Sequence, residues 1–109
     1  AWLRSEKTNI SYVQENNYIA EGTKMIYFIE YYYGKYKIVD LHMLTKEDAK
    51  IELINAINNA DFDIKCLVVI HGYHGGTVIK KLVRQEFTND NIDEKINLDA
   101  GRTIYKLKN

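Results

Sequence analysis

The sequence predicts a single small α/β domain over residues 25–109. Several short runs are rich in β-branched and aromatic residues, which is typical of strands. Two longer segments repeat apolar residues every three or four positions, as amphipathic helices do. A chain of 109 residues has the size of one domain and can bury one core. We therefore expect helices packed on a sheet.

The overall charge provides no general attraction for a polyanion. The 15 basic and 15 acidic residues cancel, so any contact with nucleic acid must depend on a local group of charges. The single cysteine, Cys66, lies in an apolar run and is expected in the core. No run approaches the roughly 20 apolar residues of a membrane span, and no signal sequence is recognised. We expect a cytoplasmic protein without a membrane partner.

The first third of the chain divides into two parts. Residues 1–24 are polar and lack a sustained period of 2 or 3.6, which predicts a loosely attached arm. The run from Met25 to Tyr33 is dense in aromatic and β-branched residues and predicts an extra N-terminal strand, followed by a turn at Gly34. Its tyrosines fit either a strand half buried on one face or a platform on which unpaired bases stack.

A strand, a helix and a second strand are expected next. Residues 36–42 form the first strand, and Thr45 followed by Asp48 resembles a capping box that starts a helix. The apolar stripe of that helix consists of Ala49, Leu53, Ala56, Ile57 and Ala60. Residues 64–70 are almost continuously apolar, as expected for a central parallel strand covered on both faces.

The last part of the chain predicts a helix and a hairpin. Glycines follow the strand at 64–70, and the helix after them buries Val78, Leu82, Val83 and Phe87. Residues 92–98 and 102–108 then alternate and form an antiparallel hairpin. The order is β, βαβ, α, ββ. A right-handed strand-helix-strand unit brings the ends of its two parallel strands to one edge of the sheet, where open α/β sheets bind ligands.

Two groups of residues at that edge are candidates for chemistry. Asp40 and His42 stand two positions apart at a strand end, so a carboxylate can orient an imidazole that titrates near neutrality. The same pair also fits a polar strand end that only satisfies a loop amide. The second group is the loop that follows the other strand, which consists of His71, Gly72, Tyr73, His74, Gly75 and Gly76.

That loop fits a phosphate site, although its glycines also fit a sharp strand-to-helix turn. Glycines let backbone amides approach an anion, and the following helix start adds partial positive charge. Lys80, Lys81 and Arg84 lie just beyond the loop, either as phosphate contacts or as a solvated face. Neither the dinucleotide fingerprint nor the P-loop spacing is present.

Two chemistries use these histidines. Asp40, His42, His71 and His74 resemble a donor set for zinc or another transition metal. Without metal, one histidine takes the proton of a 2′-hydroxyl and another protonates the leaving oxygen, while loop amides and nearby cations stabilise the phosphorane. Asp40, His42 and His71 are then the catalytic residues, and no cofactor is needed.

The combined motifs resemble the small MutS-related (Smr) domain over residues 38–107. The matching segments are IVDLH at 38–42, VIHG at 69–72 with Gly76, and Gly101 ahead of Thr103. They correspond to the family signatures LDLH-G and HGxGxG. The resemblance implies a two-layer β-α-β-α-β-β sandwich and binding of RNA or DNA. In some members it also implies endonuclease activity.

The sequence departs from the Smr pattern at three positions. Met43 stands where the first signature has Gly, His74 replaces the second loop Gly, and Tyr73 occupies a position that is often Lys or Arg. We expect a phosphodiester-cleaving endonuclease that acts on RNA or unpaired DNA. The alternatives are a non-catalytic nucleic-acid or protein adaptor, which pairs through the edge of the Tyr-rich strand, and a metal-dependent hydrolase of a small phosphorylated molecule. The sequence leaves the oligomeric state open.

Overall fold

The computed structural model describes residues 28–72 and 77–109. Residues 33–109 form one compact unit, and residues 28–32 belong to a separate N-terminal unit. The larger unit contains β1 (Tyr36–Asp40), α2 (Lys46–Asn59), β2 (Cys66–Ile70), α3 (Val78–Lys81), the π-helical turn η2 (Leu82–Glu86), β3 (Ile92–Asp99) and β4 (Arg102–Leu107). This order confirms the predicted α/β fold.

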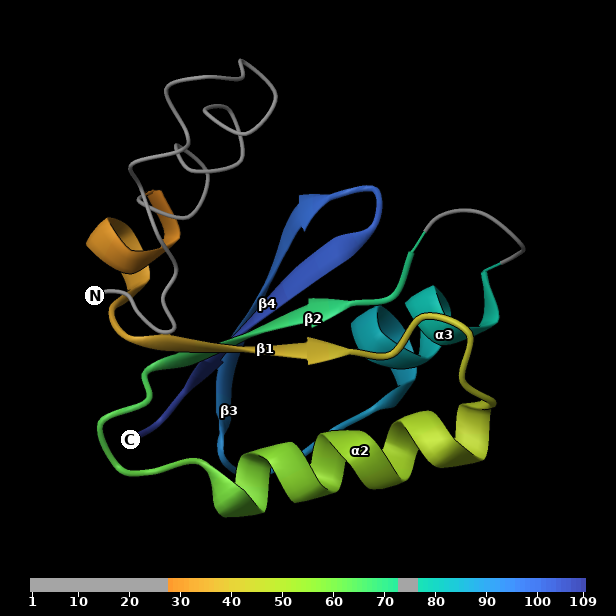
Figure 1. Ribbon diagram of the computed structural model, residues 1–109, viewed down its shortest axis with the longest axis horizontal. Coiled ribbons are helices and arrows are strands. Elements are labelled where there is room, and N and C mark those ends of the chain that lie inside the picture. Colours follow the sequence, from red (N-terminus) through yellow and green to blue (C-terminus); the bar gives the residue numbers. More distant parts are fainter. Residues whose placement is uncertain (1–27, 73–76) are drawn as a thin grey trace, which may run out of the picture. The chain divides into compact units, whose positions relative to one another are not determined.

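The sheet has the strand order β1-β2-β4-β3. β1 and β2 are parallel and connected through α2, whereas β4 pairs antiparallel with both β2 and β3. The carboxyl ends of β1 and β2 therefore lie at the same edge of the sheet (Figure 1). The two motifs singled out in the sequence follow these two strand ends.

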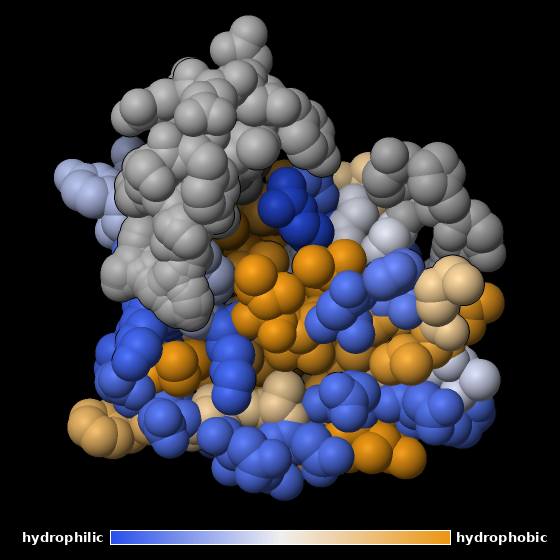
Figure 2. All heavy atoms as spheres, viewed as in Figure 1, coloured by the Kyte–Doolittle hydropathy of each residue, from blue (hydrophilic) through white to orange (hydrophobic). Residues whose placement is uncertain are grey.

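One face of the sheet packs against α2, α3 and η2 (Figure 1). The buried side chains of this interface are Val39, Leu41, Ala49, Leu53, Ile57, Ile64, Leu67, Val69, Leu82, Val83, Phe87, Tyr105 and Leu107. The Tyr105 hydroxyl donates a hydrogen bond to the Val83 carbonyl at 2.7 Å, and the Tyr105 ring stacks on Phe87. Figure 2 shows hydrophilic residues along the exposed side of α2 and apolar residues over β1 and β2.

Local signals in the sequence explain α2 and β2. The Thr45 hydroxyl accepts a hydrogen bond from the Asp48 backbone N–H at 3.1 Å, which confirms the predicted helix start. β2 is buried from Cys66 to Val69, as its apolar composition predicts. Burial raises the pKa of the Cys66 thiol to about 12, so this cysteine is a core residue and an inert one.

The described part of the run predicted as an extra N-terminal strand, residues 28–33, is helical. Phe28 and Tyr32 stand four positions apart, and their ring centroids lie 4.8 Å apart. This spacing suits a helix face, where residues i and i+4 are neighbours. Residues 1–27, which include the predicted arm at 1–24, lie outside the described residues. Among the described residues, no helix is long and apolar enough to cross a membrane.

Candidate active site

The carboxyl end of β1 holds a carboxylate–imidazole pair. The strand ends at Asp40, two residues earlier than predicted, and His42 lies in the turn that follows. His42 Nδ1 lies 2.5 Å from Asp40 Oδ1, and the same oxygen accepts the His42 backbone N–H at 3.1 Å. An ionised carboxylate only accepts hydrogen bonds, so Nδ1 carries the ring hydrogen and Nε2 has the lone pair.

The pair is accessible from solvent. The side chains of His42 and Asp40 are 56% and 49% exposed. Among the described residues, His42 Nε2 has no hydrogen-bond partner. The imidazole is therefore oriented by Asp40 and presents a basic nitrogen outward, which is the arrangement that a general base requires.

A tight turn carries His42. The Leu44 backbone N–H donates to the Leu41 carbonyl at 3.2 Å, and Met43, the third residue of this turn, has a φ of +73°. Such a φ favours glycine. The Smr signature has glycine at this position, and the geometry supplies the physical reason. Met43 itself is 91% exposed.

The end of β2 differs from the end of β1, because His71 is buried with 6% exposure. Its Nδ1 lies 3.1 Å from the Gly72 carbonyl oxygen, which can only accept, so Nδ1 carries the hydrogen. Its Nε2 lies 2.9 Å from the Thr103 hydroxyl, which donates to it. Burial lowers the pKa of His71, the Gly72 hydrogen bond opposes that shift, and the charges of Arg84 and Lys80 add to it. His71 is neutral and both ring nitrogens are engaged.

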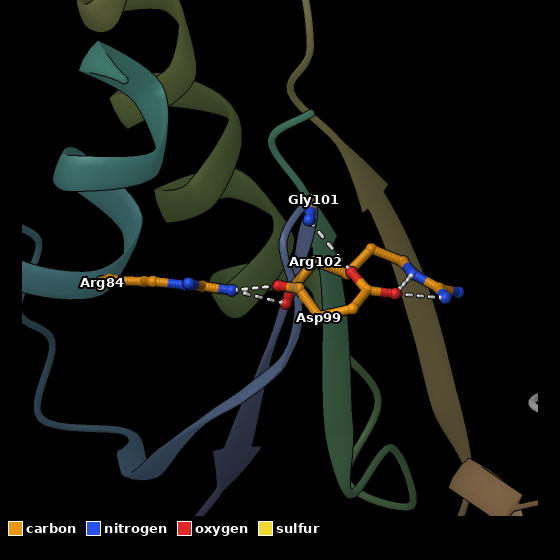
Figure 3. A network of polar contacts seen from close by, with 4 residues as sticks. All are labelled: Arg84, Asp99, Gly101 and Arg102. Atoms are coloured by element: carbon orange, nitrogen blue, oxygen red, sulfur yellow. Dashed lines mark hydrogen bonds and ion pairs between the residues drawn. The ribbon is translucent and has the colours of Figure 1, made fainter. Parts of the chain in front are cut away.

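Arg84, which the sequence places either among phosphate contacts or on a solvated face, points to the β3–β4 turn. Its Nε donates to the Thr103 hydroxyl at 2.7 Å. Its Nη2 donates to the carbonyl oxygens of Arg102, at 3.1 Å, and of Asp99. Figure 3 shows the guanidinium reaching this turn from the helical side. Arg84 therefore anchors the turn and, through Thr103, holds the ring of His71.

The same turn holds the start of the glycine loop. The backbone N–H groups of His71 and Gly72 both donate to the Gly101 carbonyl, at 2.9 and 3.1 Å. Gly72 has a φ of +74°, and a Cβ built there would lie 3.5 Å from the Cβ of His42. The two motifs therefore meet at Gly72 and His42. Tyr73, His74, Gly75 and Gly76 lie outside the described residues.

Lys80 and Lys81, the two lysines considered together with Arg84 as phosphate contacts, have different surroundings from Arg84. Lys81 is exposed and lies 3.9 Å from Glu86, a carboxylate that also pairs with Lys46 at 2.8 Å. Lys80 is half-buried and acts on His71 through its charge. The basic face of this helix is therefore partly neutralised by Glu86.

Asp99 and Arg102 complete the turn, and neither residue was predicted to belong to the site. Arg102 Nε and Nη2 donate to Asp99 Oδ2 at 3.0 and 2.6 Å, and the Gly101 N–H donates to Oδ1 at 3.0 Å. Burial raises the pKa of Asp99, but these hydrogen bonds outweigh it and lower the pKa overall. The signal available in the sequence was the alternation of residues 102–108, which places Arg102 at the end of a strand.

A groove of about 390 Å³ lies between β1 and α2 and includes Asp40 in its lining. Its lining residues are Lys37, Ile38, Val39, Asp40, Glu52, Asn55, Ala56 and Asn59. Lys37 and Glu52 offset each other, and the remaining carboxylate, Asp40, is shared with the His42 pair. The charge of the groove therefore does not distinguish it from the His42 side.

The predicted metal donor set is not gathered within the described residues. Among residues 28–72 and 77–109, no three His, Cys, Asp or Glu side chains are grouped as a metal ion requires. Both ring nitrogens of His71 make hydrogen bonds within the protein, so neither is available to a metal ion. His74, the fourth predicted donor, lies outside this part of the chain.

Comparison with known proteins agrees with the motifs. The sequence model of the Smr domain matches residues 39–98. The crystal structure of the Smr domain of Thermus thermophilus MutS2 superposes with a TM-score of 0.55 and 23% identity, and the match covers 67% of this chain and 99% of that one. A search of curated protein sequences found no match. Because the Smr model matches more than half of its residues, the chain belongs to the Smr domain family.

Proposed function

We propose that this Smr domain binds single-stranded RNA or unpaired DNA and, where the bound strand carries a 2′-hydroxyl, cleaves a phosphodiester beside the Asp40–His42 pair. The observation that carries the proposal is the orientation of His42. Its Nδ1 is held by Asp40 at 2.5 Å, and its Nε2 faces solvent. The family resemblance supports nucleic acid as the ligand class.

The residues have distinct roles in this proposal. On RNA, His42 Nε2 takes the proton of a 2′-hydroxyl, whose oxygen attacks phosphorus and displaces the 5′-oxygen, and the leaving oxygen takes its proton from water. Asp40 holds the imidazole in the required tautomer and stabilises its protonated form. His71 acts as a positioning residue rather than as a second proton-transfer group, because Gly72 and Thr103 occupy its nitrogens.

A second candidate function is a non-catalytic nucleic-acid-binding adaptor. One specific observation favours it. Within the described residues only His42 offers an imidazole nitrogen to solvent, whereas metal-free cleavage by histidines uses one group as base and another as acid. In this case the same surface binds phosphate without breaking a bond.

One experiment separates the two functions. Labelled RNA is incubated with wild type, His42→Ala and Asp40→Asn, and both binding and cleavage are measured. The nuclease proposal expects both variants to bind RNA and to lose cleavage by about 100-fold or more, the contribution of general acid–base catalysis. A wild type that binds but never cleaves, with or without divalent metal, supports the adaptor. Binding that ignores an increase in salt from about 50 to 200 mM contradicts phosphate recognition in either form.

A further inference from the structure

A cross-strand row connects the Asp40–His42 pair with the β3–β4 turn. Asp40 of β1 is paired with Ile70 of β2, and Ile70 is paired with Arg102 of β4. Directly paired residues project from the same face of a sheet, and neighbouring strands lie about 4.8 Å apart. The Cα atoms of Asp40 and Arg102 are therefore about 10 Å apart by this spacing. Their side chains share the face opposite α2 and η2, since Val39 and Leu41 occupy the helical face.

The guanidinium of Arg102 has a defined direction. Asp99 Oδ2 accepts hydrogen bonds from both Nε and Nη2, and the Gly101 N–H fixes the other oxygen of that carboxylate. Figure 3 shows the Arg102 side chain extending from the turn on the side away from Arg84. Two arginines therefore contact the same turn from opposite sides, and Arg102 belongs to the cross-strand row that it shares with Ile70 and Asp40.

Arg102 keeps donors free for a ligand. Both hydrogen bonds from its side chain go to a single carboxylate oxygen, and among the described residues Nη1 has no acceptor. The side chain is 33% exposed. A planar guanidinium held on one edge presents its other edge in the geometry that suits a phosphate.

The charges around His42 require a cation nearby. The chain as a whole is neutral, and Asp40 places a carboxylate beside His42. A phosphate that lies beside His42 thus needs a local cation. Arg102, although paired with Asp99, supplies it across Ile70 through the donors that this pair leaves free, whereas Arg84 is bound to the Thr103 hydroxyl and the turn carbonyls.

We propose that Arg102 is a phosphate-binding residue of the Asp40–His42 site, and that the nucleic-acid backbone crosses the sheet end over Ile70. The inference rests on the proposed nucleic-acid function. It adds the residue that binds the nucleic-acid backbone and the direction in which the nucleic acid crosses the sheet. Asp99 positions Arg102 for this contact.

Binding of a fluorescent single-stranded RNA to the full chain tests the assignment. Arg102→Gln is expected to raise the Kd about tenfold, the usual effect of losing a charge-assisted hydrogen bond. It should also reduce the slope of log Kd against log salt by about one phosphate contact. As a control, Lys50→Gln removes the same charge from the exposed side of α2 and should leave the Kd and the salt slope unchanged. Arg102→Lys should weaken binding while keeping the salt slope, since it retains the charge but loses the fork.

A second measurement separates this inference from the proposed function. Inorganic phosphate is titrated into the wild type while the Arg102 Nε–H signal is followed by NMR. If phosphate shifts the Arg102 Nε–H signal but the protein binds no nucleic acid, Arg102 is still a phosphate-binding residue and the proposed function is wrong. RNA binding with a wild-type Kd and salt slope in folded Arg102→Gln would overturn the Arg102 assignment and keep the function. If phosphate causes no shift and RNA does not bind, both the Arg102 assignment and the proposed function are overturned.

Discussion

Gly72 packs directly against His42, since a Cβ at Gly72 would lie 3.5 Å from the Cβ of His42. This contact connects the ends of β1 and β2, and with them the two motifs of the family. The distance is that of ordinary van der Waals contact, so space does not exclude a side chain. The φ of +74° does disfavour one.

Replacement of Gly72 by alanine therefore tests backbone strain at the site. The left-handed conformation costs a residue with a Cβ about 1–2 kcal/mol, and we expect Gly72→Ala to lower the free energy of unfolding by about that amount. Urea denaturation measures the change. An unchanged free energy of unfolding would show that the loop relaxes to a negative φ in the variant.

The opposite effect is expected at Met43, because this residue has a side chain and yet adopts a φ of +73°. Met43→Gly should raise the free energy of unfolding by about 1 kcal/mol, since glycine adopts this conformation without a Cβ penalty. Met43→Ala is the matched control. It keeps the Cβ and removes only exposed atoms, so its stability should stay close to that of wild type. Equal effects of the two variants would argue against strain in this turn.

Thr103 makes the hydrogen bonds that hold both His71 and Arg84. Thr103→Val preserves the shape but leaves two buried groups without their partner, so we expect a loss of about 1–3 kcal/mol in the free energy of unfolding. Thr77→Val is the control, because Thr77 is exposed and makes no capping hydrogen bond. The account is contradicted if both threonine variants unfold at the same urea concentration as wild type.

His71 gives the protein a pH-dependent stability of known sign. Its pKa is lower in the folded state than in the unfolded chain, mainly because of burial. The unfolded chain therefore binds a proton first as the pH falls below about 6.5, the ordinary value for histidine. The contribution of neutral His71 is complete above that pH and is lost as the pH falls toward the folded pKa. NMR titration of the His71 ring should give a midpoint below the ordinary value; a midpoint at or above it would contradict the burial of a neutral ring.

The fold was largely predictable because its signals are local. Thr45 and Asp48 mark the start of α2, the apolar run at 66–69 marks a strand buried on both faces, and alternation marks the hairpin. Residues 28–33 carry the composition of a strand but are helical, and Phe28 and Tyr32 fit that helix through their spacing. Composition alone does not distinguish the two for a short aromatic run.

The parts of the candidate site that follow a strand end could be predicted from the sequence. The parts that depend on how two strands align could not. Asp40 and His42 could be paired from their spacing, whereas the position of Arg102 depends on how β4 aligns with β2. Arg84 was placed on the exposed face of the predicted helix because it follows Lys80 by four residues. In the structure the Phe87 N–H bonds to the Leu82 carbonyl five residues earlier, and this π turn changes the directions that α-helical spacing assumes.

The most direct test of the central claim is chemical rescue of His42→Ala by imidazole. If His42 Nε2 transfers the proton, free imidazole should restore RNA cleavage to His42→Ala in proportion to its concentration, and RNA with a 2′-deoxy sugar at the cleaved position should stay intact. Cleavage by His42→Ala at the wild-type rate, or a loss that imidazole does not restore although RNA still binds, would contradict the assignment of His42 as the catalytic base.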